Sequence, residues 1–296
     1  MRNIFRYPKF RIEMTARASP SAPLLPGVDF FFSAGGARLR YRDEGRGPAV
    51  LLLHGWTLDL EMWNPQVAEL RDDFRLIRLD RRGHGLSSGI PTPERDAADL
   101  AALCTHLGLI RVALLGMSQG VRGALAFTAS APERVSALIL DGPPALDPTS
   151  VAEVEEVPLA RYVTLLRTHG IEALRREWAR HPLMQLRTSD PPTRALLAAM
   201  LQRYAGNDLQ HSSAADPPAA ACPALASIRA PTLVLSGEFD LPARRQAARQ
   251  LAARLPHTEL SLVGDAGHLP NLDSPHTYSN LCRAFLSRHV APHESS

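Results

Sequence analysis

The chain has 296 residues, of which 45% are hydrophobic and 21% charged, and this excludes a wholly disordered protein and fits one large or two small globular domains. The formal net charge is +3, but the Arg residues are spread among acidic residues along the chain and Lys9 is the only lysine. The composition therefore does not favour a nucleic-acid surface, and we expect no nucleic-acid partner.

The cysteines and the N-terminal region indicate where the protein works. Cys104, Cys222 and Cys282 are odd in number, have no metal-ligand spacing and lie among apolar residues, which predicts buried thiols in a reducing compartment. No apolar run long enough for a signal peptide or a membrane span follows the first charges, so we expect a cytoplasmic protein without a membrane partner. Residues 1–26, with Ser-Pro-Ser-Ala-Pro among them, are typical of a poorly ordered extension.

From Phe30 the pattern predicts a hairpin that turns at Gly35-Gly36. After it, apolar runs of strand length alternate with amphipathic helical stretches. The predicted strands cover residues 49–53, 75–79, 111–115, 135–140, 232–235 and 258–263. Continuous apolar strands separated by helices indicate an α/β fold, with a mostly parallel sheet covered by helices on both faces.

The alternation stops between Asp141 and about Ala230. Helices are predicted over 159–169 and 171–180, and a Pro- and Ala-rich segment near 214–224 is more typical of a loop. An insertion at the carboxyl ends of the strands would cover the place where ligands bind in open α/β sheets. We therefore divide the chain into a core, residues 27–143 and 226–296, and a helical cap insertion, residues 144–225.

The sequence Gly116-Met117-Ser118-Gln119-Gly120 lies between a predicted strand and a predicted helix, as in a nucleophile elbow. Such a turn forces the serine into the left-handed backbone region, so the residues two before and two after it must be small. Gly116 and Gly120 satisfy this requirement. The pattern predicts Ser118 as a nucleophile, with the amino end of the next helix directed at developing negative charge.

A serine needs a base and a group that orients the base. His268 follows the last predicted strand and is the candidate base, and Asp240 follows the preceding strand and is the preferred acid. The chain order Ser, Asp, His is the order that this elbow requires. Glu238 and Asp141 remain as alternative acids.

Two backbone N–H groups are the candidate oxyanion hole. His54-Gly55-Trp56 follows the strand at 49–53, so the N–H of Trp56 is expected to face the elbow, together with the N–H of Gln119. The loop 80–87, Asp-Arg-Arg-Gly-His-Gly-Leu-Ser, is expected to brace the site. The glycine-rich phosphate-binding motifs GxGxxG and GxxxxGK(S/T) are both absent from the sequence, so nucleotide binding is not favoured.

These landmarks, in this order, resemble the α/β-hydrolase superfamily over residues 30–289. They are HGW at 54–56, DRRGHGLS at 80–87, GMSQG at 116–120, GEFD at 237–240 and GH at 267–268. The chain is most similar to the cofactor-free haloperoxidase, esterase and enol-lactonase branch, and this resemblance implies eight strands with a small helical cap after the sixth. It also implies Ser118, His268 and Asp240 as the triad, with the N–H groups of Trp56 and Gln119 as the oxyanion hole.

The hypothesis is a serine hydrolase that cleaves a small ester or lactone through an acyl-enzyme, with no metal or organic cofactor. Perhydrolysis, acyl transfer and carbon–carbon cleavage with the same triad remain alternatives, as does a non-catalytic ligand receptor on this fold. Trp56, Met117 and Leu241 are predicted to line an apolar substrate pocket. Several cap residues could contact an acid group of the substrate, but most of them are expected to lie on solvated helix faces. They are Arg161, Tyr162, Arg167, His169, Arg175, Trp178 and His181. The oligomeric state is left open.

Overall fold

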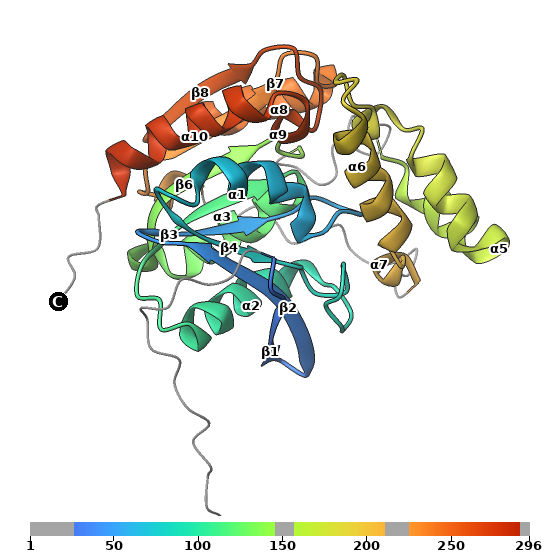
Figure 1. The fold of residues 1–296 in the computed structure, drawn as a ribbon, viewed down its shortest axis with the longest axis horizontal. Coiled ribbons are helices and arrows are strands. Elements are labelled where there is room, and N and C mark those ends of the chain that lie inside the picture. The colour runs from blue at the N-terminus through green and yellow to red at the C-terminus, as the bar shows by residue number, and fades with distance from the viewer. Residues whose placement is uncertain (1–26, 146–156, 211–224, 291–296) are drawn as a thin grey trace, which may run out of the picture.

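The computed structural model describes residues 27–145, 157–210 and 225–290. The predicted extension 1–26 and the Pro- and Ala-rich segment at 214–224 lie outside the described residues. Within the described ranges, the chain folds around one twisted sheet that carries a group of helices at one side (Figure 1).

An eight-stranded sheet forms the centre of the molecule, in the order β1-β2-β4-β3-β5-β6-β7-β8. β2 runs antiparallel to both of its neighbours, and the pairs from β4 to β8 are all parallel. The strands are β1 (Phe30–Ala34), β2 (Ala37–Gly45), β3 (Ala49–Leu53), β4 (Arg75–Leu79), β5 (Val112–Met117), β6 (Val135–Asp141), β7 (Thr232–Gly237) and β8 (Thr258–Val263). The predicted eight-stranded, mostly parallel α/β sheet is confirmed.

Successive strand residues point to opposite sides of the sheet, so continuously apolar strands give the sheet two apolar faces. Helices cover both of these faces. On β3, Leu52 packs in the cluster that contains α1 and α10 side chains, and Leu51 packs in the cluster with α2, α3 and α8. The covering helices are α1 (Asn64–Leu70), α2 (Pro93–His106), α3 (Gln119–Ser130), α8 (Pro242–Arg254) and α10 (Pro275–His289). Every residue of β3, β5 and β6 is buried, which explains their continuous apolar sequences.

Three strands run further than the apolar runs indicate: β5 continues to Met117, β6 to Asp141 and β7 to Gly237. The added residues have ladder partners, because Met117 pairs with Asp141 and Gly237 pairs with Val263. The sheet therefore extends to the residue before Ser118. The nucleophile elbow begins directly at the end of a strand that is paired on both sides.

The cap helices lie between β6 and β7 in the chain and at one side of the sheet (Figure 1). They are α5 (Leu159–Trp178), α6 (Pro191–Arg203) and α7 (Asn207–Gln210). Gly170, at φ 76° and ψ 177°, divides α5 into two arms, at the position where the sequence pattern separates two helices. Short turns complete the described chain: η1 (Leu60–Trp63), η2 (Pro132–Arg134), η3 (Pro182–Met184), η4 (Leu225–Ser227) and α9 (Pro270–Asp273).

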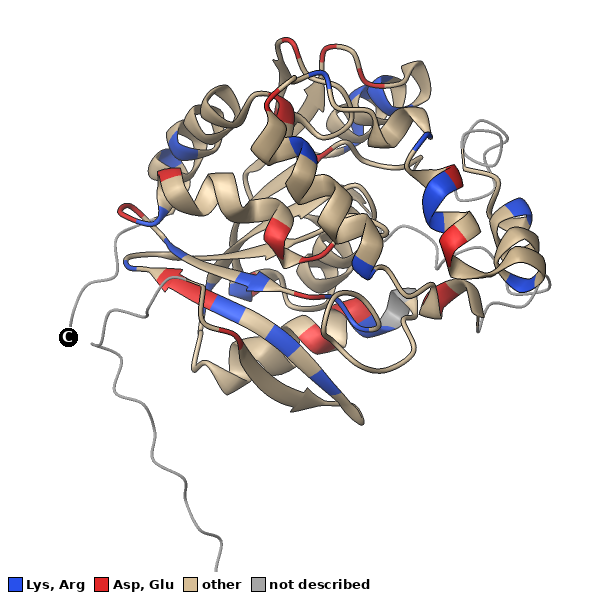
Figure 2. Ribbon diagram, turned by 45° about the vertical axis from the view of Figure 1, so that its right-hand side comes forward, with Lys and Arg blue, Asp and Glu red and all other residues tan. Residues whose placement is uncertain are grey.

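Basic and acidic residues are interspersed over the ribbon of both core and cap (Figure 2). Among the helices of the described ranges, none is both long and apolar enough to span a bilayer. The core and cap are joined by one apolar cluster, which contains residues of α1 and α10 together with Leu166, Leu174 and Met200 of the cap.

Candidate active site

Ser118 occupies the sharp turn between β5 and α3, with φ 50° and ψ −117°. The turn brings backbone segments into close contact: a Cβ atom added to Gly120 would lie 2.5 Å from the Leu53 carbonyl oxygen, and one added to Gly116 would lie 2.6 Å from the Gly120 carbonyl oxygen. Both positions therefore require glycine. Ser118 donates its N–H to the Asp141 carbonyl at 2.8 Å, which fixes the strained turn to β6.

The structure brings Ser118, His268 and Asp240 together in a buried line. The Nε2 atom of His268 lies 3.2 Å from the Ser118 Oγ, and its Nδ1 atom lies 2.9 Å from the Asp240 Oδ2. With Nδ1–H donating to the carboxylate, Nε2 is left to accept the serine proton. The side chains of His268 and Asp240 are 2% and 1% exposed, so water does not compete for these hydrogen bonds.

The alternative acids occupy different positions. Glu238 is exposed and accepts a hydrogen bond from the Asp265 N–H at 3.3 Å. Asp141 is completely buried at the end of β6. Burial raises the pKa of Asp141 well above its ordinary value, and the charge of Asp240 adds to the rise. Of the three carboxyl groups, Asp240 is the one within hydrogen-bond distance of His268.

The loops that carry the acid and the histidine hold each other. The N–H of Phe239 donates to the Ala266 carbonyl at 2.8 Å. A Cβ atom at Gly237 would lie 2.0 Å from the Gly267 carbonyl oxygen, so the two loops are in direct backbone contact. Asp273 accepts the N–H of Gly267 at 2.8 Å and that of Arg187, in the cap, at 2.7 Å. The histidine loop is thus fixed to both the core and the cap.

The segment 54–57, which we call the oxyanion loop, lies against the elbow. A Cβ atom at Gly55 would lie 2.7 Å from the Met117 Sδ and 3.4 Å from the Ser118 Cβ, so the residue before Trp56 packs against Ser118. Gln119 is the first residue of α3, and the first N–H groups of a helix have no acceptor within it. This arrangement is compatible with the predicted roles of the Trp56 and Gln119 N–H groups, which remain predictions.

His54 fixes the oxyanion loop on its core side. Its Nε2 accepts the Arg81 N–H at 2.9 Å, so the proton is on Nδ1, which donates to the Gly55 carbonyl at 2.7 Å. Complete burial lowers the pKa of His54 well below its ordinary value, with His84 and Arg81 adding to the effect. His54 is therefore a neutral structural residue, and burial likewise lowers the pKa of His84.

Two cap residues contact the oxyanion loop from the other side. The Trp56 Nε1–H donates to the Asp208 Oδ2 at 2.6 Å, and the Trp178 Nε1–H donates to the Thr57 Oγ1 at 2.8 Å. Thr57 has φ 63°, which is unusual for a β-branched residue and costs about 1–3 kcal/mol. The cap therefore helps to hold a strained segment next to Ser118.

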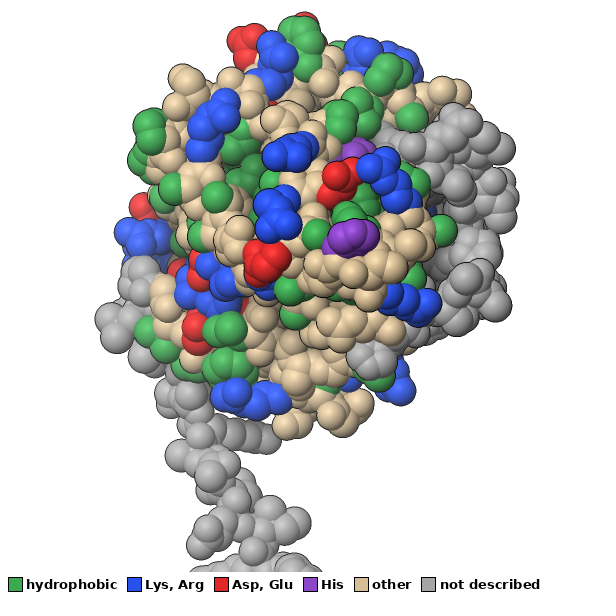
Figure 3. All heavy atoms as spheres, turned by 90° about the vertical axis from the view of Figure 1, so that its right-hand side faces the viewer, with side chains coloured by type: hydrophobic (Ala, Val, Ile, Leu, Met, Phe, Trp, Pro, Cys, Tyr) green, Lys and Arg blue, Asp and Glu red, His purple; other side chains and the backbone are tan. Residues whose placement is uncertain are grey.

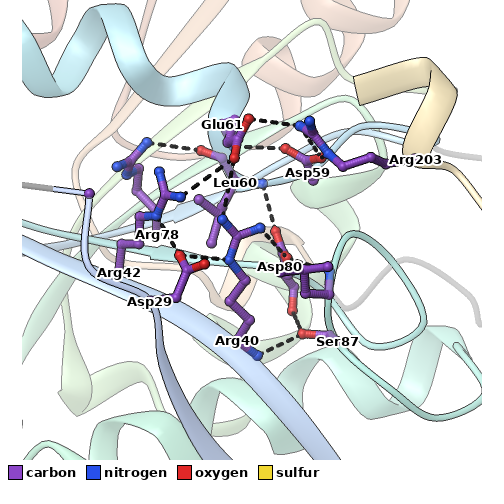
Figure 4. Close-up of polar contacts among 12 residues, drawn as sticks. Asp29, Arg40, Arg42, Asp59, Leu60, Glu61, Arg78, Asp80, Ser87 and Arg203 are labelled. Carbon is purple, nitrogen blue, oxygen red and sulfur yellow. Dashed lines mark hydrogen bonds and ion pairs between the residues drawn. The ribbon is translucent and has the colours of Figure 1, made fainter. Parts of the chain in front are cut away.

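An ionic network of buried and partly exposed side chains includes Asp59 and Glu61, which follow the oxyanion loop (Figure 4). Arg40 contacts the Asp80 Oδ2 at 3.2 Å and the Glu61 Oε1 at 3.3 Å. From α6 of the cap, Arg203 contacts the Asp59 Oδ2 at 2.7 Å and the Glu61 Oε2 at 2.8 Å. The network connects the first strands, the oxyanion region and the cap, and the loss of one buried partner would leave an uncompensated charge.

The predicted pocket residues lie at the boundary of core and cap. Trp56 and Met117 are buried, and Leu241 is half-buried against the same apolar cluster. Two surface hollows of about 450 and 390 Å³ lie instead on α5, where both include Arg161 and Glu177. Figure 3 views the cap side, where basic, acidic, histidine and apolar side chains are interleaved. The role of Trp56, Met117 and Leu241 as a pocket remains a prediction.

The sequence does not predict the positions of several residues around the site. Tyr162 and Trp178 belong to the cap residues that are mostly expected to face water, but both are buried against Trp56, with the Trp56 and Trp178 ring centroids 4.6 Å apart. The available signal was the helical spacing of apolar residues, Tyr162 with Leu166. Asp208 and Asp273 had no comparable signal. Within the described part of the chain, no group of three His, Cys, Asp or Glu residues is arranged to hold a metal ion.

Comparison with known proteins gives consistent matches. Residues 48–275 match the α/β hydrolase fold family. A Bacillus subtilis (strain 168) protein with the provisional name 2-succinyl-6-hydroxy-2,4-cyclohexadiene-1-carboxylate synthase is 28% identical over 85% of this chain and 96% of its own. The pimeloyl-[acyl-carrier protein] methyl ester esterase of Nitrosomonas europaea is 27% identical over 82% and 97%. The enol-lactonase structure from Burkholderia xenovorans LB400 covers 87% of this chain and 99% of its own, with 28% identity and a TM-score of 0.73.

Proposed function

The chain belongs to the α/β hydrolase family of enzymes, and on that basis we propose that it is a serine hydrolase that cleaves a small organic ester or lactone through an acyl-enzyme. The observation that carries the proposal is the continuous contact from Ser118 through His268 to Asp240, at 3.2 Å and 2.9 Å, on a nucleophile elbow. The geometry matches what a serine needs in order to attack a carbonyl carbon.

In the acylation step, the Ser118 Oγ attacks the substrate carbonyl while His268 Nε2 takes the hydroxyl proton. Asp240 holds the imidazole ring and stabilises the imidazolium that forms. The tetrahedral intermediate then expels the alcohol, which receives the proton from His268. For a lactone, the released alcohol remains attached to the acyl group.

The negatively charged oxygen of the tetrahedral intermediate is proposed to accept hydrogen bonds from the Trp56 and Gln119 N–H groups. Each donor of this kind is worth about 3 kcal/mol of barrier. The position of Gly55 against Ser118, and of Gln119 at the start of α3, supports the assignment.

Deacylation repeats the chemistry with water as the nucleophile. His268 takes a proton from water, the hydroxide attacks the acyl carbonyl, and the same proton returns to Ser118 as the acid leaves. Each cycle therefore consumes one ester and one water and restores the enzyme.

The relatives support an ester or lactone as the substrate class. One is named as a methyl ester esterase and another as an enol-lactonase, and both are matched over more than four-fifths of this chain. The apolar side chains of Trp56, Met117 and Leu241 near the triad favour an acyl group with apolar character. The specific compound is not proposed.

Replacement of Ser118 tests the proposal. We expect wild-type protein to hydrolyse p-nitrophenyl acetate or butyrate, and Ser118→Ala to lose on the order of 10⁴-fold or more in kcat with an unchanged circular dichroism spectrum. Retention of wild-type kcat in the alanine variant would reject the proposed nucleophile.

A further inference from the structure

The oxyanion loop is held from two sides by different parts of the chain. On the core side, His54 accepts the Arg81 N–H at 2.9 Å. On the cap side, Trp56 and Thr57 contact Asp208 and Trp178, which lie 152 and 121 residues away in the sequence. The geometry of this loop therefore depends on how the cap packs on the core.

Asp208 has a specific connection to this loop. Its Oδ2 accepts the Trp56 Nε1–H at 2.6 Å, and its Oδ1 accepts the Tyr204 hydroxyl proton at 2.6 Å. Its neighbour Asn207 donates to the Gly83 carbonyl at 3.2 Å, which seats α7 on the core. Both carboxylate oxygens thus have donors with short, charge-assisted geometry.

The Trp56 indole has little freedom to move while this contact is present. Its ring lies 4.6 Å from that of Trp178 and 6.0 Å from those of Tyr162 and Tyr204, between centroids. The next residue, Thr57, has the unfavourable φ of 63° and is held by the Trp178 indole. A change in the Trp56 side chain is therefore transmitted to its own backbone and to the strained Thr57 next to it. The Trp56 N–H is one of the two proposed oxyanion donors.

We infer that Asp208 is a positioning residue of the cap, which sets the Trp56 backbone N–H for the oxyanion through its hydrogen bond with the Trp56 indole. The inference rests on the proposed function and adds that the cap takes part in the reaction as well as covering the site. It assigns Asp208 no contact with substrate. Loss of the contact should weaken transition-state stabilisation and leave ground-state binding nearly unchanged.

The test is a double-mutant cycle with p-nitrophenyl butyrate. Asp208→Ala and Trp56→Phe each remove one partner of the hydrogen bond, and we expect each to lower kcat about 10- to 100-fold, because a misplacement of about 1 Å at a catalytic group costs about 10²-fold. KM should stay near the wild-type value. The double variant should be no slower than the slower single variant, because both changes break the same contact.

A transition-state analogue separates positioning from general damage. A trifluoromethyl ketone forms an oxyanion adduct with an active serine, so its Ki should rise in Asp208→Ala by the same factor as kcat/KM falls. Asp190→Ala is the matched control, because Asp190 is an exposed cap carboxylate that caps α6 through Thr193 and does not contact the oxyanion loop. Its kcat should equal that of wild type.

Three results would overturn the inference: unchanged kcat in Asp208→Ala, a loss confined to KM, or effects of the two changes that multiply. If Asp208→Ala does not fold, Asp208→Asn takes its place, and we expect it to lose less kcat. A kcat of Asp208→Asn equal to that of wild type would contradict the inference. Wild-type protein without Ser118-dependent turnover would reject the proposed function and the inference together. Normal wild-type turnover with unaffected Asp208 variants would reject the inference alone.

Discussion

The nucleophile elbow and the cap hold neighbouring residues by different means. At the elbow, backbone packs on backbone, and Gly116 and Gly120 leave no space for a side chain. At the cap, side chains reach across the boundary, as Asp208 does to Trp56. Ser118 is thus held by contacts within the core, whereas the stabilisation of negative charge that we propose would depend on contacts between the core and the cap.

The largest expected effect beyond the nucleophile itself concerns the two buried carboxyl groups of the core. Asp240→Asn should lower kcat by about 10³- to 10⁴-fold, because the amide neither favours the required histidine tautomer nor stabilises the imidazolium. Asp141→Asn is the matched variant, since burial raises the pKa of Asp141 and so favours the uncharged form that Asn resembles. It should change kcat by less than about tenfold.

Steady-state kinetics on both variants, with thermal unfolding as a control, decides between the carboxyl groups. A severe loss in Asp141→Asn with full activity in Asp240→Asn would move the acid to β6. The triad would then be assembled differently from the proposal.

The free energy of unfolding is expected to depend on pH through Asp80, in the ionic network that joins core and cap. Burial raises the pKa of Asp80 from 3.8 to about 6, with the charge of Asp59 adding to the rise and Arg40 opposing it. The folded state therefore binds more protons than the unfolded state between these values, and stability should fall as pH rises from about 4 to about 6. The rise in the pKa of Asp80 corresponds to about 3 kcal/mol of folding stability.

Urea unfolding at several pH values, compared between wild type and Asp80→Asn, measures this contribution. The wild-type free energy of unfolding should decline relative to that of the variant across this range. A wild-type curve parallel to the variant curve would show that Asp80 titrates alike in both states.

The smallest expected effect concerns the backbone contact at the elbow. Gly120→Ala places a Cβ atom 2.5 Å from the Leu53 carbonyl oxygen and should destabilise the fold by about 1–3 kcal/mol, because neither backbone segment can shift freely. Gly264→Ala is the matched control, since its nearest neighbour is a Glu238 Oε2 atom 3.9 Å away. Equal unfolding midpoints for the two variants would contradict the account of the elbow.

The sheet and the elbow could be predicted from the sequence because their signals are local. Buried parallel strands give continuous apolar runs such as 49–53, and a strained turn needs glycines two residues to either side of Ser118. These signals need no knowledge of distant residues. The expected order of strand, elbow and helix is therefore visible in a short stretch of sequence.

The cap contacts could not be predicted in the same way. Asp208 lies on a helix of four residues, and its partner Trp56 is 152 residues away, so no spacing connects them. The positive φ of Thr57 is equally unexpected, because a β-branched residue gives no local sign of a left-handed backbone. Such features are decided by tertiary packing, and they are concentrated where core and cap meet.

The most direct test of the central claim is the intact mass of the protein after reaction with a fluorophosphonate, measured for wild type and Ser118→Ala. The account predicts one adduct on wild type, located at Ser118 by peptide mapping, and none on the variant. A folded wild-type protein without an adduct, or an equal adduct on the alanine variant, would contradict the claim that Ser118 is the activated nucleophile.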